Sequence, residues 1–210
     1  MTSPRTLLKA WNIRAQKHLG QHFLADPSTA NMIVARSDLS VSDIVLEIGA
    51  GLGALTIPIA RCVEKVFAVE KDAQLFNLLQ TELLVHNISN VVLLRDDFLR
   101  CDLRAMADER NPQLIVMGNL PYRISTQVLL RLIAFRDVVE RSVLMFQKEL
   151  AERLKARPGN KEYGRLTVML RYCAEITSIA VVDAGLFFPI PAVDSEGLEI
   201  KFMRRPENAA

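Results

Sequence analysis

The chain has 210 residues, of which 50% are hydrophobic, and its formal net charge is +2. This length favours one domain with a substantial buried core. No apolar run is long enough to cross a membrane, and the first twenty residues lack a cleavable signal pattern. Cys62, Cys101 and Cys173 are odd in number and widely spaced, so we expect reduced thiols in a cytoplasmic protein.

The small net charge conceals an uneven distribution. Residues 1–25 contain four Lys or Arg and no acid, and residues 131–171 contain ten Lys or Arg against five acids. The remainder is net acidic. This segregation suits binding to a phosphate backbone, although ordinary solvated helix faces explain it equally well. The histidines His18, His22 and His86 show no metal-binding spacing, so we expect no metal.

Taken in chain order, residues 1–20 lack a clean period, so we expect a basic, loosely attached segment before a domain at 21–205. Asp26 and Pro27 start the first helix of that domain. Strands are expected at 43–48, 65–69, 91–94, 114–117, 142–146, 176–182 and 197–202. One helix is expected to start at 27, and another follows the glycines and ends at about 61. Further helices are expected at 75–83, 124–135, 149–156 and 163–172, with a short one within 101–112.

Strands that alternate with helices predict an α/β fold with a mainly parallel, doubly wound sheet. No helix separates the last two strands, so we expect them to pair antiparallel. Ligands of such sheets bind at the carboxyl ends of the strands. Gly49, Glu70, Asp96 and Asn119 stand at four successive strand ends, which predicts a shared site there.

The segment Val45–Thr56 reads as a buried strand, a tight turn at Gly49 and Gly51, and a helix whose free N–H groups face a ligand. Such a glycine pattern indicates a nucleotide-type site. Gly49, Gly51 and Ala54 also fit the dinucleotide fingerprint, with Glu70 as its ribose-binding acid. At this point an NAD enzyme and an S-adenosylmethionine (SAM) enzyme are both open.

The sharpest motif is Asn119-Leu120-Pro121-Tyr122. Pro121 lacks an N–H, so carbonyls around it can point into a cleft. The Asn119 oxygen and a neighbouring carbonyl can both accept from one exocyclic amine, and Tyr122 offers a stacking face. These features suit a planar base with an amino group. An Asn-x-Pro turn with a packed tyrosine is the structural alternative.

With this motif the chain resembles the ribosomal RNA adenine N6,N6-dimethyltransferases, close to the type that acts on small-subunit (16S) RNA. The resemblance extends from Gln21 to Phe202. Its motifs are Gln21–Leu24, Glu47–Gly51, Glu70, Asp96, Asn119–Tyr122, Gln147–Glu149, Tyr163–Leu166 and Phe188–Ser195. It implies a Rossmann-like SAM-dependent methyltransferase fold with a seven-stranded sheet, an antiparallel last strand and helices on both faces.

The resemblance also implies roles by position. SAM would be held by His22, Leu24, Gly49, Gly51, Glu70, Asp96 and Asn119. The catalytic motif would be Asn119, Leu120, Pro121 and Tyr122, with Tyr122 and Phe188 sandwiching the target adenine. The implied partner is ribosomal RNA or a small-subunit precursor, bound by a monomer.

Three positions depart from the family pattern: His22 replaces a common Asn, Arg123 a common Asn, and Ala192 a common Lys. The chain also ends at Ala210, where the family normally continues into a helical domain, so we expect that domain to be absent. The large-subunit enzymes of the antibiotic-resistance type are one alternative, which Tyr163–Leu166 and Val193–Ser195 disfavour. A non-catalytic nucleic-acid-binding relative is another, which the intact Glu70, Asp96 and Asn119 disfavour.

Overall fold

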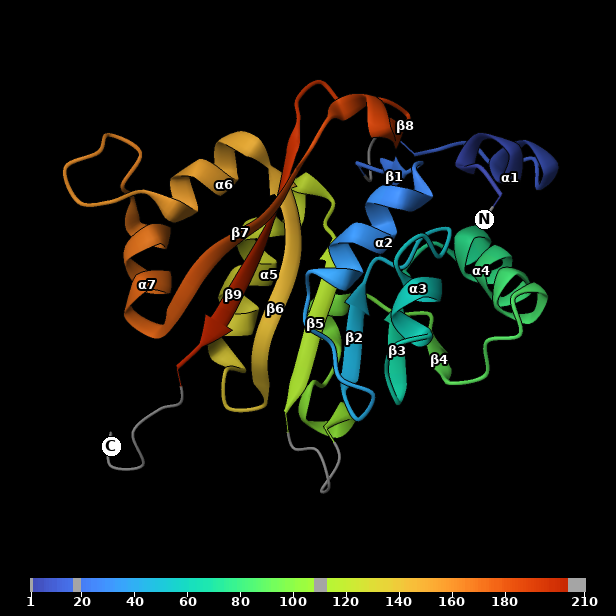
Figure 1. Ribbon diagram of the computed structural model, residues 1–210, viewed down its shortest axis with the longest axis horizontal. Coiled ribbons are helices and arrows are strands. Elements are labelled where there is room, and N and C mark those ends of the chain that lie inside the picture. Colours follow the sequence, from blue (N-terminus) through green and yellow to red (C-terminus); the bar gives the residue numbers. More distant parts are fainter. Residues whose placement is uncertain (1, 17–19, 108–112, 204–210) are drawn as a thin grey trace.

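The computed structural model describes residues 2–16, 20–107 and 113–203, and within them seven strands form one twisted sheet (Figure 1). Their order across the sheet is β4-β3-β2-β5-β6-β9-β7. The bounds are β2 (Ile44–Ile48), β3 (Lys65–Val69), β4 (Val91–Leu94), β5 (Leu114–Asn119), β6 (Val139–Gln147), β7 (Ala174–Val182) and β9 (Ser195–Phe202). β9 runs antiparallel to both β6 and β7, as expected for the last strand.

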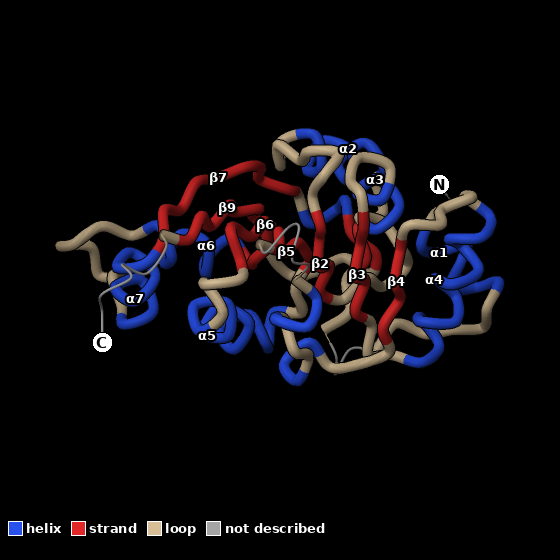
Figure 2. The backbone as a smooth tube through the Cα atoms, turned by 90° about the horizontal axis from the view of Figure 1, so that it is seen from below, coloured by secondary structure: helices blue, strands red, loops and turns tan. Residues whose placement is uncertain are grey.

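Helices cover both faces of the sheet, because the central strands are apolar on both sides (Figure 2). One face packs against α5 (Ser125–Ala134), α6 (Lys148–Lys155) and α7 (Arg165–Cys173). The other face packs against α2 (Pro27–Ala35), α3 (Thr56–Ala60) and α4 (Ala73–Val85). Among the described residues, no helix has both the length and the apolar character that crossing a membrane requires. This doubly wound α/β architecture confirms the predicted fold class.

The N-terminal segment is more ordered than its sequence indicates. It forms α1 (Pro4–Ala10), whose first turn is capped by the Ser3 side chain. Apolar side chains of this segment pack against the domain in one cluster, composed of Leu7, Leu8, Ile13, Phe23, Leu52, Leu75 and Leu78. The Gln16 amide also donates to Asp72 across 2.6 Å. A seven-residue helix is too short to show a period, and its burial comes from tertiary contacts. Residues 17–19 lie outside the described part of the chain.

A second, two-stranded sheet joins distant parts of the chain. β1 (Phe23–Leu24) pairs antiparallel with β8 (Phe187–Phe188), with Phe23 opposite Phe188 and Leu24 opposite Phe187. The Ala25 N–H extends the pairing by donating to Leu186 O across 2.7 Å. Two-residue strands give no periodic signal, so the sequence did not predict them. Their pairing brings the segment before α2 over the carboxyl edge of the large sheet.

Most boundaries lie within about two residues of the sequence-based expectation, and larger differences occur at three places. The helix after the glycines begins only at Thr56, and β6 is longer than 142–146. Within 101–112, where a short helix was expected, the described residues form a 3₁₀ turn at Arg104–Met106 that follows another at Phe98–Arg100. Residues 108–112 lie outside the described part, as do residues 204 and 205 at the expected domain end.

Candidate active site

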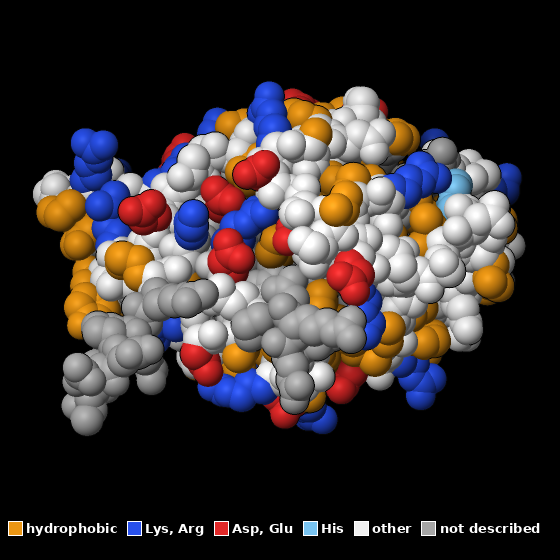
Figure 3. All heavy atoms as spheres, turned by 60° about the horizontal axis from the view of Figure 1, so that its bottom comes forward, with side chains coloured by type: hydrophobic (Ala, Val, Ile, Leu, Met, Phe, Trp, Pro, Cys, Tyr) orange, Lys and Arg blue, Asp and Glu red, His pale blue; other side chains and the backbone are white. Residues whose placement is uncertain are grey.

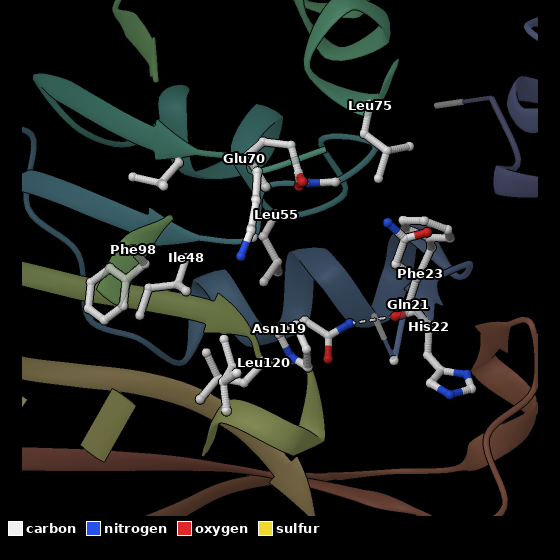
Figure 4. Close-up of a pocket in the computed structure, with 18 of the residues that line it drawn as sticks. Gln21, His22, Phe23, Ile48, Leu55, Glu70, Leu75, Phe98, Asn119 and Leu120 are labelled. Carbon is white, nitrogen blue, oxygen red and sulfur yellow. Dashed lines mark hydrogen bonds between the residues drawn. The ribbon is translucent and has the colours of Figure 1, made fainter. Parts of the chain in front are cut away.

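A pocket lies at the carboxyl ends of β2, β3, β4 and β5, beneath the segment 20–24 (Figure 4). It brings together the four predicted strand-end residues, Gly49, Glu70, Asp96 and Asn119. Gly51, His22, Leu24 and the segment Leu120–Tyr122 also line it. The site residues that the sequence predicted therefore share one cavity, with the exception of Phe188.

The glycine loop after β2 is shaped by its contacts with the end of β3. The N–H groups of Gly49 and Ala50 both donate to Val69 O, at 2.9 and 3.2 Å. Gly51 adopts φ +56, and a Cβ there would lie 3.3 Å from the Phe23 ring. α3 starts only at Thr56, beyond the loop, and not directly after the glycines. The N–H groups of the loop residues Gly49, Ala50 and Gly51 all donate within the protein, which disfavours their use for the pyrophosphate of a dinucleotide.

Glu70 stands between this loop and the start of α4. Its Oε2 accepts from the Gly51 N–H and its Oε1 from the Asp72 N–H, each across 2.8 Å. The residue is only 7% exposed, and burial raises the pKa of its carboxyl while the two N–H donors oppose that shift. A carboxylate offers about four acceptor sites, so two remain for a ligand. This arrangement suits the two hydroxyls of a ribose.

Two neighbouring carboxylates follow β4, and they have different partners. Asp97 pairs with Lys71 across 2.8 Å, and that hydrogen bond lowers the pKa of the Asp97 carboxyl. Asp97 also caps the following turn by accepting from the Leu99 N–H. Asp96 is exposed and lines the pocket, with its Oδ1 accepting from the Asp97 N–H across 2.7 Å. Asp96 is therefore the acceptor better placed for an amino group of the ligand.

Asn119 ends β5 and is oriented by the segment above the pocket. Its Nδ2 donates to the His22 backbone oxygen across 2.8 Å (Figure 4). A backbone carbonyl only accepts hydrogen bonds, so the amide nitrogen of Asn119 must face His22 and its Oδ1 must point the other way. Pro121 follows two residues later and has no N–H to compete for acceptors. The pocket therefore contains a fixed amide oxygen at the carboxyl end of β5.

Tyr122 lies beside this motif and contacts His22. The two rings stack with their centroids 5.8 Å apart and an interplanar angle of 24°. The Tyr122 hydroxyl lies 3.1 Å from Ser195 Oγ, and His22 Nδ1 lies 2.7 Å from Pro189 O. Burial raises the pKa of the Tyr122 phenol above its usual value. Tyr122 is thus an aromatic ring at the pocket wall, and His22 stacks against it.

The structure does not bring Phe188 into the pocket lining. In β8 it is half-buried opposite Phe23 and packs against the cluster of α1 side chains. The predicted sandwich of Tyr122 and Phe188 therefore remains a prediction, and the ring that stacks on Tyr122 here belongs to His22.

Of the apolar lining, Leu24, Leu120 and Pro121 were predicted from the sequence and the other residues were not. Figure 4 shows Phe98 and Ile48 close to the predicted Leu120 on one side of the cavity. Leu55, Leu75 and Phe23 are among the other apolar residues of the lining. Phe98 directly follows the carboxylates after β4, so its position at a strand end was an available signal. Phe23 carried no such signal, because the β1–β8 pairing places it.

The strand order, the antiparallel β9 and a pocket with a carboxylate at the end of β3 define a Rossmann-like methyltransferase. Residues 12–209 match the family described as ribosomal RNA adenine dimethylase, and the chain belongs to this family.

Individual relatives agree with this assignment. The ribosomal RNA small subunit methyltransferase A of Desulforapulum autotrophicum is 50% identical over 202 residues, which cover 96% of this chain and 70% of that protein. The crystal structure of a dimethyladenosine transferase from Plasmodium falciparum has a TM-score of 0.77 and 29% identity, covering 86% of this chain and 63% of that chain. The crystal structure of the 23S rRNA methyltransferase ErmE has a TM-score of 0.75 and 28% identity, and the match covers 90% of this chain and 72% of that chain.

Proposed function

We propose that this protein transfers methyl groups from SAM to the N6 amines of adenines in small-subunit ribosomal RNA, giving N6,N6-dimethyladenine. The observation that carries the proposal is the orientation of Asn119, whose amide oxygen is fixed by the 2.8 Å bond to His22. Relatives named for the small ribosomal subunit support this substrate over the large-subunit RNA of ErmE. The similar TM-scores of the two solved structures do not separate these substrates.

The pocket residues suit the parts of SAM. The Gly49–Gly51 turn would admit its methionine part, Glu70 would accept from the ribose hydroxyls, and Asp96 would accept from the adenine amine. Leu24 and the buried apolar lining would contact the adenosine, and His22 would contribute its main chain. When bound, SAM supplies an electrophilic methyl group on a sulfonium.

The protein's own contribution is to position a weak nucleophile. The N6 lone pair of adenine is delocalised into the ring. Two acceptors, Asn119 Oδ1 and the Leu120 carbonyl, would favour a pyramidal nitrogen whose lone pair faces the methyl group. Tyr122 would hold the base by stacking. Positioning and local electrostatics account for the rate, and the proton can leave to water after transfer.

The direct test compares two RNAs. The protein is incubated with isotope-labelled SAM and unmethylated small-subunit or large-subunit ribosomal RNA, and digested nucleosides are identified by mass spectrometry. We expect dimethyladenosine from the small-subunit RNA and none with Asn119→Ala. Dimethyladenosine from the large-subunit RNA alone would reassign the substrate. SAM binding without any methylated adenine would refute the proposed reaction.

A further inference from the structure

An apolar lip lies beside His22, one of the residues that line the pocket. It consists of the uncharged residues 189–193, Pro-Ile-Pro-Ala-Val, between β8 and β9. Ile190 is 68% exposed at its tip, and Ala192 and Val193 are exposed beside it. A surface that binds only phosphates would be expected to carry cations at this place. The lip instead presents an aliphatic side chain next to the proposed base site.

Both ends of the lip are attached to the stacked rings of that site. At one end, Pro189 O accepts from His22 Nδ1 across 2.7 Å. Two residues beyond the other end, at the start of β9, Ser195 Oγ lies 3.1 Å from the Tyr122 hydroxyl. Figure 4 shows the His22 ring turned toward the segment that carries the lip. Because of these bonds, Ile190 is held at a defined place relative to the Tyr122 ring.

The lip is also stiff. Pro189 and Pro191 flank Ile190, and each proline ring fixes its own φ. Pro191 is buried, which anchors the far side of the tip. A stiff, exposed aliphatic residue loses little conformational entropy when it enters a contact. These are the properties of a wedge that separates stacked bases.

We propose that Ile190 is an RNA wedge, which enters the base stack beside the target and occupies the space that the adenine leaves. The inference rests on the proposed function, because only a base that must reach the Tyr122 pocket has to leave its stack. Unstacking costs a few kcal/mol, and nucleic-acid-binding proteins insert Ile, Leu, Met, Phe or Pro between base steps. Ile190 is thus a positioning residue for the RNA and does not contact SAM.

The experiment uses the methylated site mapped in small-subunit RNA. Two synthetic RNAs carry this site, one intact and one with an abasic residue in place of the nucleotide next to the target. The abasic RNA has a gap in its stack, so a wedge is not needed. Ile190→Ala is compared with wild type, with Ile190→Leu, and with Leu84→Ala, a control that removes a side chain 73% exposed on α4.

We expect Ile190→Ala to raise KM for the intact RNA about tenfold, which corresponds to about 1.4 kcal/mol. KM for the abasic RNA and Kd for SAM should not change, and Ile190→Leu should behave as wild type. An unchanged KM on intact RNA refutes the wedge. An equal rise of KM on both RNAs also refutes the wedge, since it indicates a general docking contact. Methylation of the abasic RNA by the wild-type protein tests the proposed reaction separately.

Discussion

The side-chain nitrogen of Asn119 and the backbone oxygen of His22 lie 2.8 Å apart, although the residues are 97 positions apart in the chain. The bond fixes the amide and holds the segment before β1 over the pocket. Asn119→Asp replaces the donor with a carboxylate that faces a carbonyl oxygen. We expect kcat to fall about 100-fold or more, as with the loss of one preorganised active-site group.

The matched control for Asn119→Asp is Asn90→Asp. Asn90 also donates its amide to backbone carbonyls, those of Ala60 and Val63, at 2.8 and 3.0 Å. It does not line the pocket. Both variants should lower the melting temperature, whereas only Asn119→Asp should lower kcat of the folded fraction. Equal losses of kcat would mean that the Asn119 bond serves stability alone.

Glu70→Gln tests the proposed ribose contact. The amide loses the charge and turns one acceptor into a donor beside the Gly51 or Asp72 N–H. Hydrogen bonds to charged groups contribute about 1.5–3 kcal/mol, so Kd for SAM should rise about 10- to 150-fold. Calorimetric titration measures it, with Glu82→Gln as the control because Glu82 is equally buried on α4 outside the pocket. Unchanged SAM affinity of Glu70→Gln would remove Glu70 from the cofactor site.

Tyr122 provides a test of base stacking that separates its ring from its hydroxyl. Tyr122→Phe keeps the ring and loses the contact with Ser195 at 3.1 Å, whereas Tyr122→Ala loses both. Stacking contributes about 1–3 kcal/mol per base, so Tyr122→Ala should lower kcat/KM for RNA about 5- to 150-fold. Tyr122→Phe should keep most activity, and both should bind SAM normally. A destabilised Tyr122→Ala with normal specific activity would make Tyr122 a packing residue.

The large sheet and most of the pocket were predictable because their signals are local. The central parallel strands β2 to β5 are mostly apolar runs, and Gly49, Glu70, Asp96 and Asn119 lie at or just beyond their carboxyl ends. The topology of a parallel sheet then places these residues at one edge. What escaped prediction depends on contacts between distant segments. The β1–β8 pairing sets the places of Phe23 and Phe188, and tertiary packing orders α1.

Charge counts were misleading for a similar reason. Of the ten basic residues in 131–171, Arg141 is buried against Glu199, Lys155 pairs with buried Glu196, and Arg131 donates to Cys101 O. A sequence cannot distinguish these internal cations from exposed ones, because their partners lie far away in the chain. The exposed cationic surface is therefore smaller than the composition indicates.

Glu47 gives a prediction for the pH dependence of stability. It lies in β2 with 2% exposure, and burial raises the pKa of its carboxyl to about 8 from 4.5. Between these two pH values the folded protein keeps a proton on Glu47 that the unfolded chain releases. The contribution of Glu47 to the free energy of unfolding is therefore most favourable at low pH and is lost as pH rises toward 8. Glu47→Gln removes the titration.

The measurement is the melting temperature of wild type and Glu47→Gln between pH 5 and pH 9. We expect the melting temperature of the variant to rise relative to that of wild type as pH rises. In a domain of this size, each kcal/mol of stability that wild type loses corresponds to about 2–4 °C. Glu70, whose pKa burial also raises and whose charge adds to the shift of Glu47, is present in both proteins. Parallel profiles would show that Glu47 does not retain its proton in the folded state.

The exposed cations that remain on one side of the molecule lie around α6 and α7. They include Arg153, Arg157, Lys161, Arg165 and Arg171. Figure 1 shows the loop between these two helices projecting from the left of the molecule. The face at the amino ends of the strands differs, because acidic and basic side chains are interspersed on it (Figure 3). We therefore expect phosphates to bind at α6 and α7.

Exchanging Arg157 and Lys161 for Gln tests this surface through the salt dependence of RNA binding. Each lost phosphate contact should reduce the slope of log K against log salt by about 0.7–0.9, so the double variant should lose about 1.5. Filter binding at several salt concentrations measures it, with SAM affinity expected to stay constant. Arg61→Gln is the control, since Arg61 is exposed just before β3, at the edge of the sheet away from the pocket. If Arg61→Gln lowers the slope while the double variant leaves it unchanged, the RNA backbone does not follow α6 and α7 and must cross the amino-end face.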